Sequence, residues 1–160
     1  MGIVQRHKVL AFYGVPGEND SVTYTRMSKF TSLTQNKNPI EYSRQYVDEP
    51  FTETDVVGYG PTIDYAFDKH TGNTVHEDIV AVTNGEKLGD EAVRTIVIID
   101  ISDTTVTGFK REYSVIPGTE GDNVNIYTYS GSFKARGEKV DVSSITTTDD
   151  YQTITFTEAD

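Results

Sequence analysis

The fold class is indicated most clearly by the stretch Pro61-Thr62-Ile63-Asp64-Tyr65-Ala66-Phe67-Asp68, in which large apolar residues alternate with polar ones. Ile63, Tyr65 and Phe67 fall on one face of an extended chain, as expected for a half-buried β-strand. The same alternation recurs along the chain and predicts further strands over Val9–Tyr13, Ser21–Phe30, Glu41–Val47, Phe109–Ile116, Asn125–Ala135 and Tyr151–Thr157.

A different kind of strand is expected at Ala92–Ile101, whose centre is apolar on both faces. Such a run is typical of a central strand that is covered on both sides. Turn dipeptides such as Pro16-Gly17 and Asn38-Pro39 separate the expected strands at mostly short intervals. The sequence therefore predicts a mainly β protein, an antiparallel β-sandwich or barrel.

One short α-helix is expected to flank the sheet, over about residues 75–83. Thr74 and Glu77 have the spacing of a capping box, with Thr74 as the N-cap. Residues at spacings of four and three would form its buried face. These are Val75, Ile79 and Val82.

The 160 residues contain no linker-like stretch, so we expect one domain over residues 1–160 and no further domain after it. Residues 1–7 are expected to form a flexible N-terminal arm, and the polar segment at about 141–150 looks like a tail. A long exposed loop is predicted at about 47–60, because acids, Thr and Gly interrupt two good strands there.

The charge of the chain limits its partners. Lys and Arg number 14 against 25 Asp and Glu, a formal net charge of −11, so no basic face for gripping nucleic acid is expected. Cysteine is absent, which excludes disulfides and thiolate chemistry. Residues 1–8 lack the apolar core of a signal peptide, and no run could span a membrane. We expect folding in a cytoplasm and no membrane partner.

The search for catalytic or metal-binding motifs yields no site. His76-Glu77 begins an H-E-x-x-H pattern, but Val80 stands where the second His belongs. A metal cluster of His70 and His76 with neighbouring acids is conceivable; a turn His and a first-turn His are the favoured interpretation. We therefore predict no catalytic residue, no cofactor and no metal, and a protein that is not an enzyme.

Two aromatic patterns leave binding functions open. Aromatic and basic residues interleave at Tyr42–Tyr46 and at Phe133–Arg136 and could stack nucleic-acid bases, but the acidity of the chain favours core packing for both. Tyr127 and Tyr129 could form a platform for a sugar if they face outward. The alternative function is therefore a non-enzymatic β-sandwich module that binds carbohydrate or protein.

Several segments resemble the major tail tube proteins of long-tailed (siphovirus-type) phages, most closely those of phages that infect Gram-positive bacteria. The resemblance covers most of the chain. Its segments are Lys8–Gly14, Tyr24–Thr31, Tyr46–Glu49, Thr54–Tyr59, Pro61–Asp68, Val75–Val80 and Tyr129–Gly137.

This resemblance implies a β-sandwich or barrel with a flanking helix, of which six copies form a ring and stacked rings form the tail tube. DNA and the tape-measure protein would pass through the lumen, the DNA without specific binding, and tail-end proteins would be further partners. The protein would be made in the cytoplasm of the host bacterium and reside in the tail of the virion.

The predicted loop supplies the candidate contact between subunits or rings. Phe51 is its large isolated aromatic residue among acids and hydroxyls, and Pro50 breaks any regular ladder. In the competing interpretation, Phe51 folds back onto its own core. The predicted contact residues are Val47, Asp48, Glu49, Pro50, Phe51, Thr52, Glu53, Thr54 and Asp55.

Overall fold

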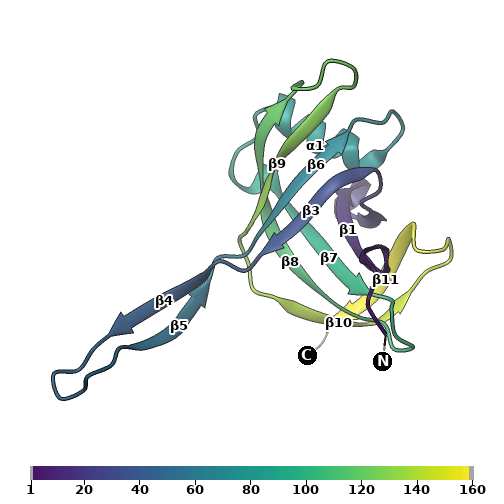
Figure 1. The fold of residues 1–160 in the computed structure, drawn as a ribbon. Coiled ribbons are helices and arrows are strands. Elements are labelled where there is room, and N and C mark those ends of the chain that lie inside the picture. The colour runs from purple at the N-terminus through teal and green to yellow at the C-terminus, as the bar shows by residue number, and fades with distance from the viewer. Residues whose placement is uncertain (1, 159–160) are drawn as a thin grey trace.

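A computed structural model describes residues 2–158, which form a mainly β fold with one flanking α-helix, as the sequence predicts (Figure 1). A nine-stranded antiparallel sheet contains β1 (Val9–Pro16), β2 (Val22–Arg26), β3 (Phe30–Asn36), β6 (Thr62–Asp68), β7 (Val93–Asp100), β8 (Thr107–Glu120), β9 (Thr128–Ala135), β10 (Val140–Thr146) and β11 (Thr153–Glu158). A separate hairpin consists of β4 (Pro39–Arg44) and β5 (Glu53–Tyr59). The remaining elements are α1 (Thr74–Asn84) and the short 3-10 turns η1 (Arg6–Lys8), η2 (Glu18–Asp20) and η3 (Gly89–Ala92).

The long strand β8 is the branch point of the sheet. Its start, Gly108–Lys110, pairs with β10, and its later part, from Tyr113 onward, pairs with β9. The strand order β10-β11-β2-β1-β7-β8 therefore closes on itself through the β8–β10 pairing. Strands β9, β6 and β3 extend outward from this closed ring, and β3 is the last strand of the extension.

Strand β7 is central, as expected for Ala92–Ile101, and its alternate side chains belong to two different cores. Val97 and Ile99 pack with Phe12 inside the closed ring. Ile96 and Ile98 point to the opposite face and pack in the larger core beneath α1. Each fully buried side chain of this size contributes about 1.5–3 kcal/mol to folding, so β7 anchors both cores.

The helix is nearly as predicted, but its N-cap is not. Its expected apolar stripe is buried, including Val75 and Ile79. Asn73, not Thr74, is the N-cap, because its Oδ1 accepts hydrogen bonds from the backbone N–H groups of Val75 (3.1 Å) and His76 (3.2 Å). Within residues 2–158, no helix is long and apolar enough to cross a membrane.

Asn73→Ala is expected to lower the free energy of unfolding by about 1 kcal/mol, because the first turn of α1 loses its cap. The side-chain amide of Asn73 also donates to the carbonyl of Ser28 (3.3 Å) in the β2–β3 connection, so the substitution removes a contact between the helix and that connection as well. The matched control is Thr74→Ala, at an exposed position. Urea titrations of both variants check this, and equal losses would contradict the assignment of the cap.

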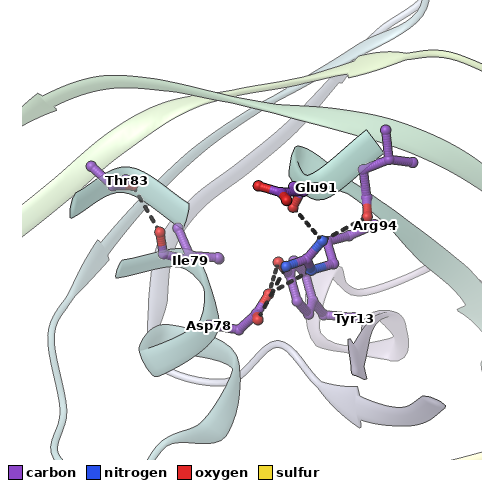
Figure 2. Close-up of polar contacts among 7 residues, drawn as sticks. Tyr13, Asp78, Ile79, Thr83, Glu91 and Arg94 are labelled. Carbon is purple, nitrogen blue, oxygen red and sulfur yellow. Dashed lines mark hydrogen bonds and ion pairs between the residues drawn. The ribbon is translucent and has the colours of Figure 1, made fainter. Parts of the chain in front are cut away.

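A largely buried ion pair between Asp78 and Arg94 fixes α1 to β7 (Figure 2). Arg94 Nε donates to Asp78 Oδ2 (2.8 Å), and the Tyr13 hydroxyl donates to the same carboxylate. Arg94 Nη1 also donates to the carbonyls of Glu91 (2.9 Å) and Val93 (2.8 Å). Burial and the nearby Asp78 carboxylate raise the pKa of Tyr13 well above its usual value. The guanidinium thus compensates a carboxylate that the fold removes from water.

In the nine-stranded sheet, two segments differ clearly from the sequence-based expectation in their secondary structure. The candidate strand Ser21–Phe30 is divided, because Lys29 adopts a left-handed conformation (φ +63°) that redirects the chain from β2 to β3. The polar segment at about 141–150 is not simply tail-like, because its first half belongs to β10. Val142 is buried there, and the hydroxyl of Thr146 lies 2.5 Å from that of Thr155 on β11.

Candidate assembly interface

The predicted exposed loop at about 47–60 instead comprises most of the tip and the whole second strand of a β-hairpin. Strands β4 and β5 pair from Pro39 opposite Tyr59 to Arg44 opposite Glu53, and residues 45–52 form the tip. We call residues 39–59 the arm; it projects away from the body of the molecule (Figure 1). The prediction of a loop was wrong for Glu53–Tyr59, since this strand has no buried face that would reveal it as an alternating pattern.

All nine predicted contact residues lie on the arm. Val47–Thr52 belong to the tip, and Glu53–Asp55 begin β5. Phe51 is 59% exposed and belongs to neither core, so the interpretation in which it folds back onto its own core is wrong. Whether these residues contact another subunit stays a prediction.

The arm carries an unusual number of exposed apolar side chains. Large solvent-exposed apolar patches on a folded chain mark interaction surfaces. The arm thus offers apolar surface for burial against a partner. The exposed residues are Ile40, Tyr42, Tyr46, Val47, Phe51, Val56, Val57 and Tyr59.

Arg44 holds the arm in shape. It forms ion pairs with Asp55 (2.6 Å) and Glu53 (3.3 Å), and its Nε donates to the Tyr46 hydroxyl (3.2 Å). Its guanidinium also lies over the ring of Tyr42, 5.3 Å from the centroid. The hydrogen bonds with Tyr46 and Asp55 raise the pKa of Arg44. An arm ordered in this way before binding loses less conformational entropy when it meets a partner.

Sequence reasoning missed the role of Arg44, although a signal was present. Tyr42, Arg44 and Tyr46 recur with a period of two, which puts them on one face of an extended chain. The preference for core packing at Tyr42–Tyr46 was wrong, because both tyrosines are exposed.

The proposed sugar platform is not formed. Tyr129 is only 6% exposed and lies in the larger core, whereas Tyr127 is half exposed. The Tyr127 hydroxyl donates to Glu120 (2.9 Å). Of the two predicted platform residues, only Tyr127 is available at the surface. A single ring supports the carbohydrate-binding alternative less well than the predicted pair.

The imagined metal cluster around His76 is also not formed. The ring of His76 is buried and stacks on Phe67, with 4.3 Å between centroids. Its Nδ1 accepts from the backbone N–H of His70 (3.1 Å), and its Nε2 lies 3.0 Å from the carbonyl of Ser28, which can only accept. Both ring nitrogens are therefore engaged in a neutral imidazole. Within residues 2–158, no group of three or more His, Asp or Glu side chains could hold a metal ion.

The buried His76 should make folding stability depend on pH. Desolvation lowers its pKa from 6.5 to about 4. Between these two values the unfolded chain binds a proton that the folded chain rejects, so stability rises with pH across this window and is lost as pH falls. Urea titrations at pH 7 and pH 5 should show a smaller pH-dependent loss for His76→Gln than for the wild type. His7→Gln, at an exposed position, is the control; identical losses in all three proteins would refute the role of His76.

Comparison with known proteins gives a fold similarity. No family model and no curated protein matches the sequence. Among solved structures, the fold resembles that of a chain in the cryo-EM structure of the anti-feeding prophage (AFP) baseplate, reconstructed with six-fold symmetry. The TM-score is 0.53 at 9% sequence identity, over 89% of this chain and 97% of that chain. The chain therefore has the fold of a component of this baseplate assembly.

Proposed function

We propose that this protein is a structural component of a phage tail, in which six copies form a ring and stacked rings form the tail tube. The observation that carries the proposal is the preformed arm, whose exposed apolar residues find no partner in either core of their own chain. The fold similarity to a chain of a six-fold symmetrised baseplate supports it. The sequence resemblance to tail tube proteins of siphovirus-type phages points the same way.

An arm that binds a different surface of the next copy makes a head-to-tail contact. Such contacts close into rings when the rotation between neighbours allows it, and they otherwise continue as helical filaments. The proposed ring needs no enzyme, cofactor or metal. The tape-measure protein, tail-end proteins and DNA in transit are the partners proposed for the tube, and the virion tail is its location.

The acidity of the chain suits a conduit for DNA. Six copies at −11 each carry a formal charge of −66 per ring. Carboxylates that line the lumen would repel phosphate over about 8 Å at physiological salt, so DNA would slide without adhering.

Electron microscopy of the concentrated, purified protein tests the proposal. Six-fold rings or tubes of uniform diameter are the expected result. Particles that stay monomeric at all concentrations would overturn it, and binding to a glycan array would then favour the carbohydrate-binding alternative.

A further inference from the structure

An open groove lies where the last strand of the sheet extension, β3, faces the start of β1. It has a volume of about 610 Å³, within the range of sites that hold a ligand or several side chains. We call it the β1–β3 groove. Its lining includes Arg6, Leu10, Arg26, Met27, Lys29 and Leu33.

The β1–β3 groove combines an apolar floor with a basic rim. Leu10 and Met27 are buried, and no Asp or Glu lines the groove. Arg6, Arg26 and Lys29 give its rim three positive charges in a chain whose net charge is −11. The ion pairs formed within residues 2–158 involve other cations, so no carboxylate there neutralises these three charges, although Arg6 is hydrogen-bonded to backbone carbonyls.

The groove also presents backbone. β3 pairs with β6 along one edge and ends the strand order, so its other edge is free of strands within the described sheet. The guanidinium of Arg6 lies at this edge: its Nη2 donates to the carbonyl of Leu33 on β3 (3.1 Å), and its Nη1 donates to the carbonyl of Val9 on β1 (2.8 Å). Free strand edges are ready pairing surfaces for another chain.

The arm is complementary to the β1–β3 groove, because it is acidic and carries exposed apolar side chains. It contains five acids and one arginine, a net charge of −4. At its tip, the exposed side chains of Tyr46, Val47 and Phe51 stand next to Asp48 and Glu49. The arm leaves the body beyond the far end of β3 and points away from it, so it does not reach the groove of its own chain (Figure 1).

We propose that the tip of the arm, residues 45–52, docks into the β1–β3 groove of a second copy of this chain. Phe51 and Val47 cover the apolar floor, and Asp48 and Glu49 face the basic rim. The inference rests on the proposed self-assembly and names the two surfaces that make the contact. Because the two surfaces differ, a copy whose arm is bound still offers its groove to another copy, so the contact can repeat along a ring or a filament.

Charge reversal on each side tests the contact. An arm variant carries Asp48→Lys and Glu49→Lys, and a groove variant carries Arg6→Glu and Lys29→Glu; Glu49 is partly buried and the other three positions are exposed. Each variant alone should need at least tenfold more protein to assemble, because like charges meet. An equimolar mixture should assemble again, since each arm then finds a groove of opposite sign. Lys69→Glu with Lys87→Glu is the control for net charge and should assemble normally.

Disulfide trapping tests the same contact independently, because the chain has no native cysteine. Val47→Cys combined with Lys29→Cys should give a ladder of covalent multimers when the assembled protein is oxidised. Either cysteine alone should give no species larger than a dimer. Thermal melting of each variant monomer confirms that it is folded.

The outcomes separate this inference from the proposed function. Tubes that form despite both charge reversals, or a mixture that is not rescued, overturn the arm-to-groove contact and leave the tube intact. Loss of binding to a DNA oligonucleotide on groove reversal, with tubes unchanged, would overturn it in favour of nucleic acid as the occupant. A wild-type protein that never assembles overturns the proposed function itself.

Discussion

Replacing the whole arm, residues 39–59, by an Asn-Gly turn should give a folded monomer that forms no tubes. The two ends of the arm already lie side by side, since the backbone N–H of Gly60 donates to the carbonyl of Asn38 (3.1 Å) and the side-chain Nδ2 of Asn38 donates to the carbonyl of Gly60 (3.1 Å). A two-residue turn fits such a pair. Both cores remain complete, because no arm residue belongs to them.

The single substitution Phe51→Ala should reproduce much of this loss, because truncating a central aromatic residue of an interface costs about 2 kcal/mol or more. Its melting temperature should stay close to that of the wild type. Leu88→Ala removes a similarly exposed apolar side chain outside the arm and should assemble normally. Electron microscopy and thermal melting decide: tubes of normal length mean that the arm is not the assembly element, and an unfolded monomer means that the arm supports the fold.

Arg94→Ala should be the most destabilising exchange of a single charged residue, lowering the free energy of unfolding by about 3–5 kcal/mol. The Arg94 and Asp78 side chains are only 9% and 15% exposed, so the variant leaves the Asp78 carboxylate largely buried and without its cationic partner. The Tyr13 hydroxyl alone cannot compensate that charge.

Two comparisons make this prediction specific. Arg136→Ala breaks an ion pair with Asp90 that is 47% and 90% exposed, and it should cost less than about 1 kcal/mol. Asp78→Leu combined with Arg94→Met removes both charges and should be more stable than Arg94→Ala alone. Urea titrations provide all three values. An Arg94→Ala loss no larger than that of Arg136→Ala would refute the buried-charge argument.

Local sequence patterns predicted the helix and the strands that bury one face. They did not predict structure that depends on contacts between residues distant in the sequence. The stripe of Val75, Ile79 and Val82 gave the helix, since its spacing needs no partner to be recognised. The cap was assigned one residue late because Asn73 and Thr74 are both good N-caps, and backbone geometry chooses between them.

The arm and the closure of the sheet into a ring could not be predicted from local sequence patterns. β5 has no buried residue and is mostly exposed, so its sequence shows no buried apolar face that a periodicity argument could detect. The ring is closed by the pairing of β8 with β10, for example Lys110 opposite Val140, and β9 lies between these two strands in the sequence. Arg94 lies in an otherwise apolar strand, and no local pattern pairs it with Asp78 of the helix, 16 residues earlier in the chain. The arm, the ring closure and the Arg94–Asp78 ion pair therefore depend on tertiary contacts that no single segment of the sequence reveals.

The alternation of β7 between two cores has a consequence for how the monomer melts. Neither core can open alone, because separating β7 from its neighbours exposes Val97 on one side and Ile96 on the other at the same time. Cooperative units in proteins are bounded by such shared elements. The closed ring and the helix-covered extension therefore unfold as one unit, whereas the arm, which shares no core residue, can open and exchange its amide hydrogens independently of the rest.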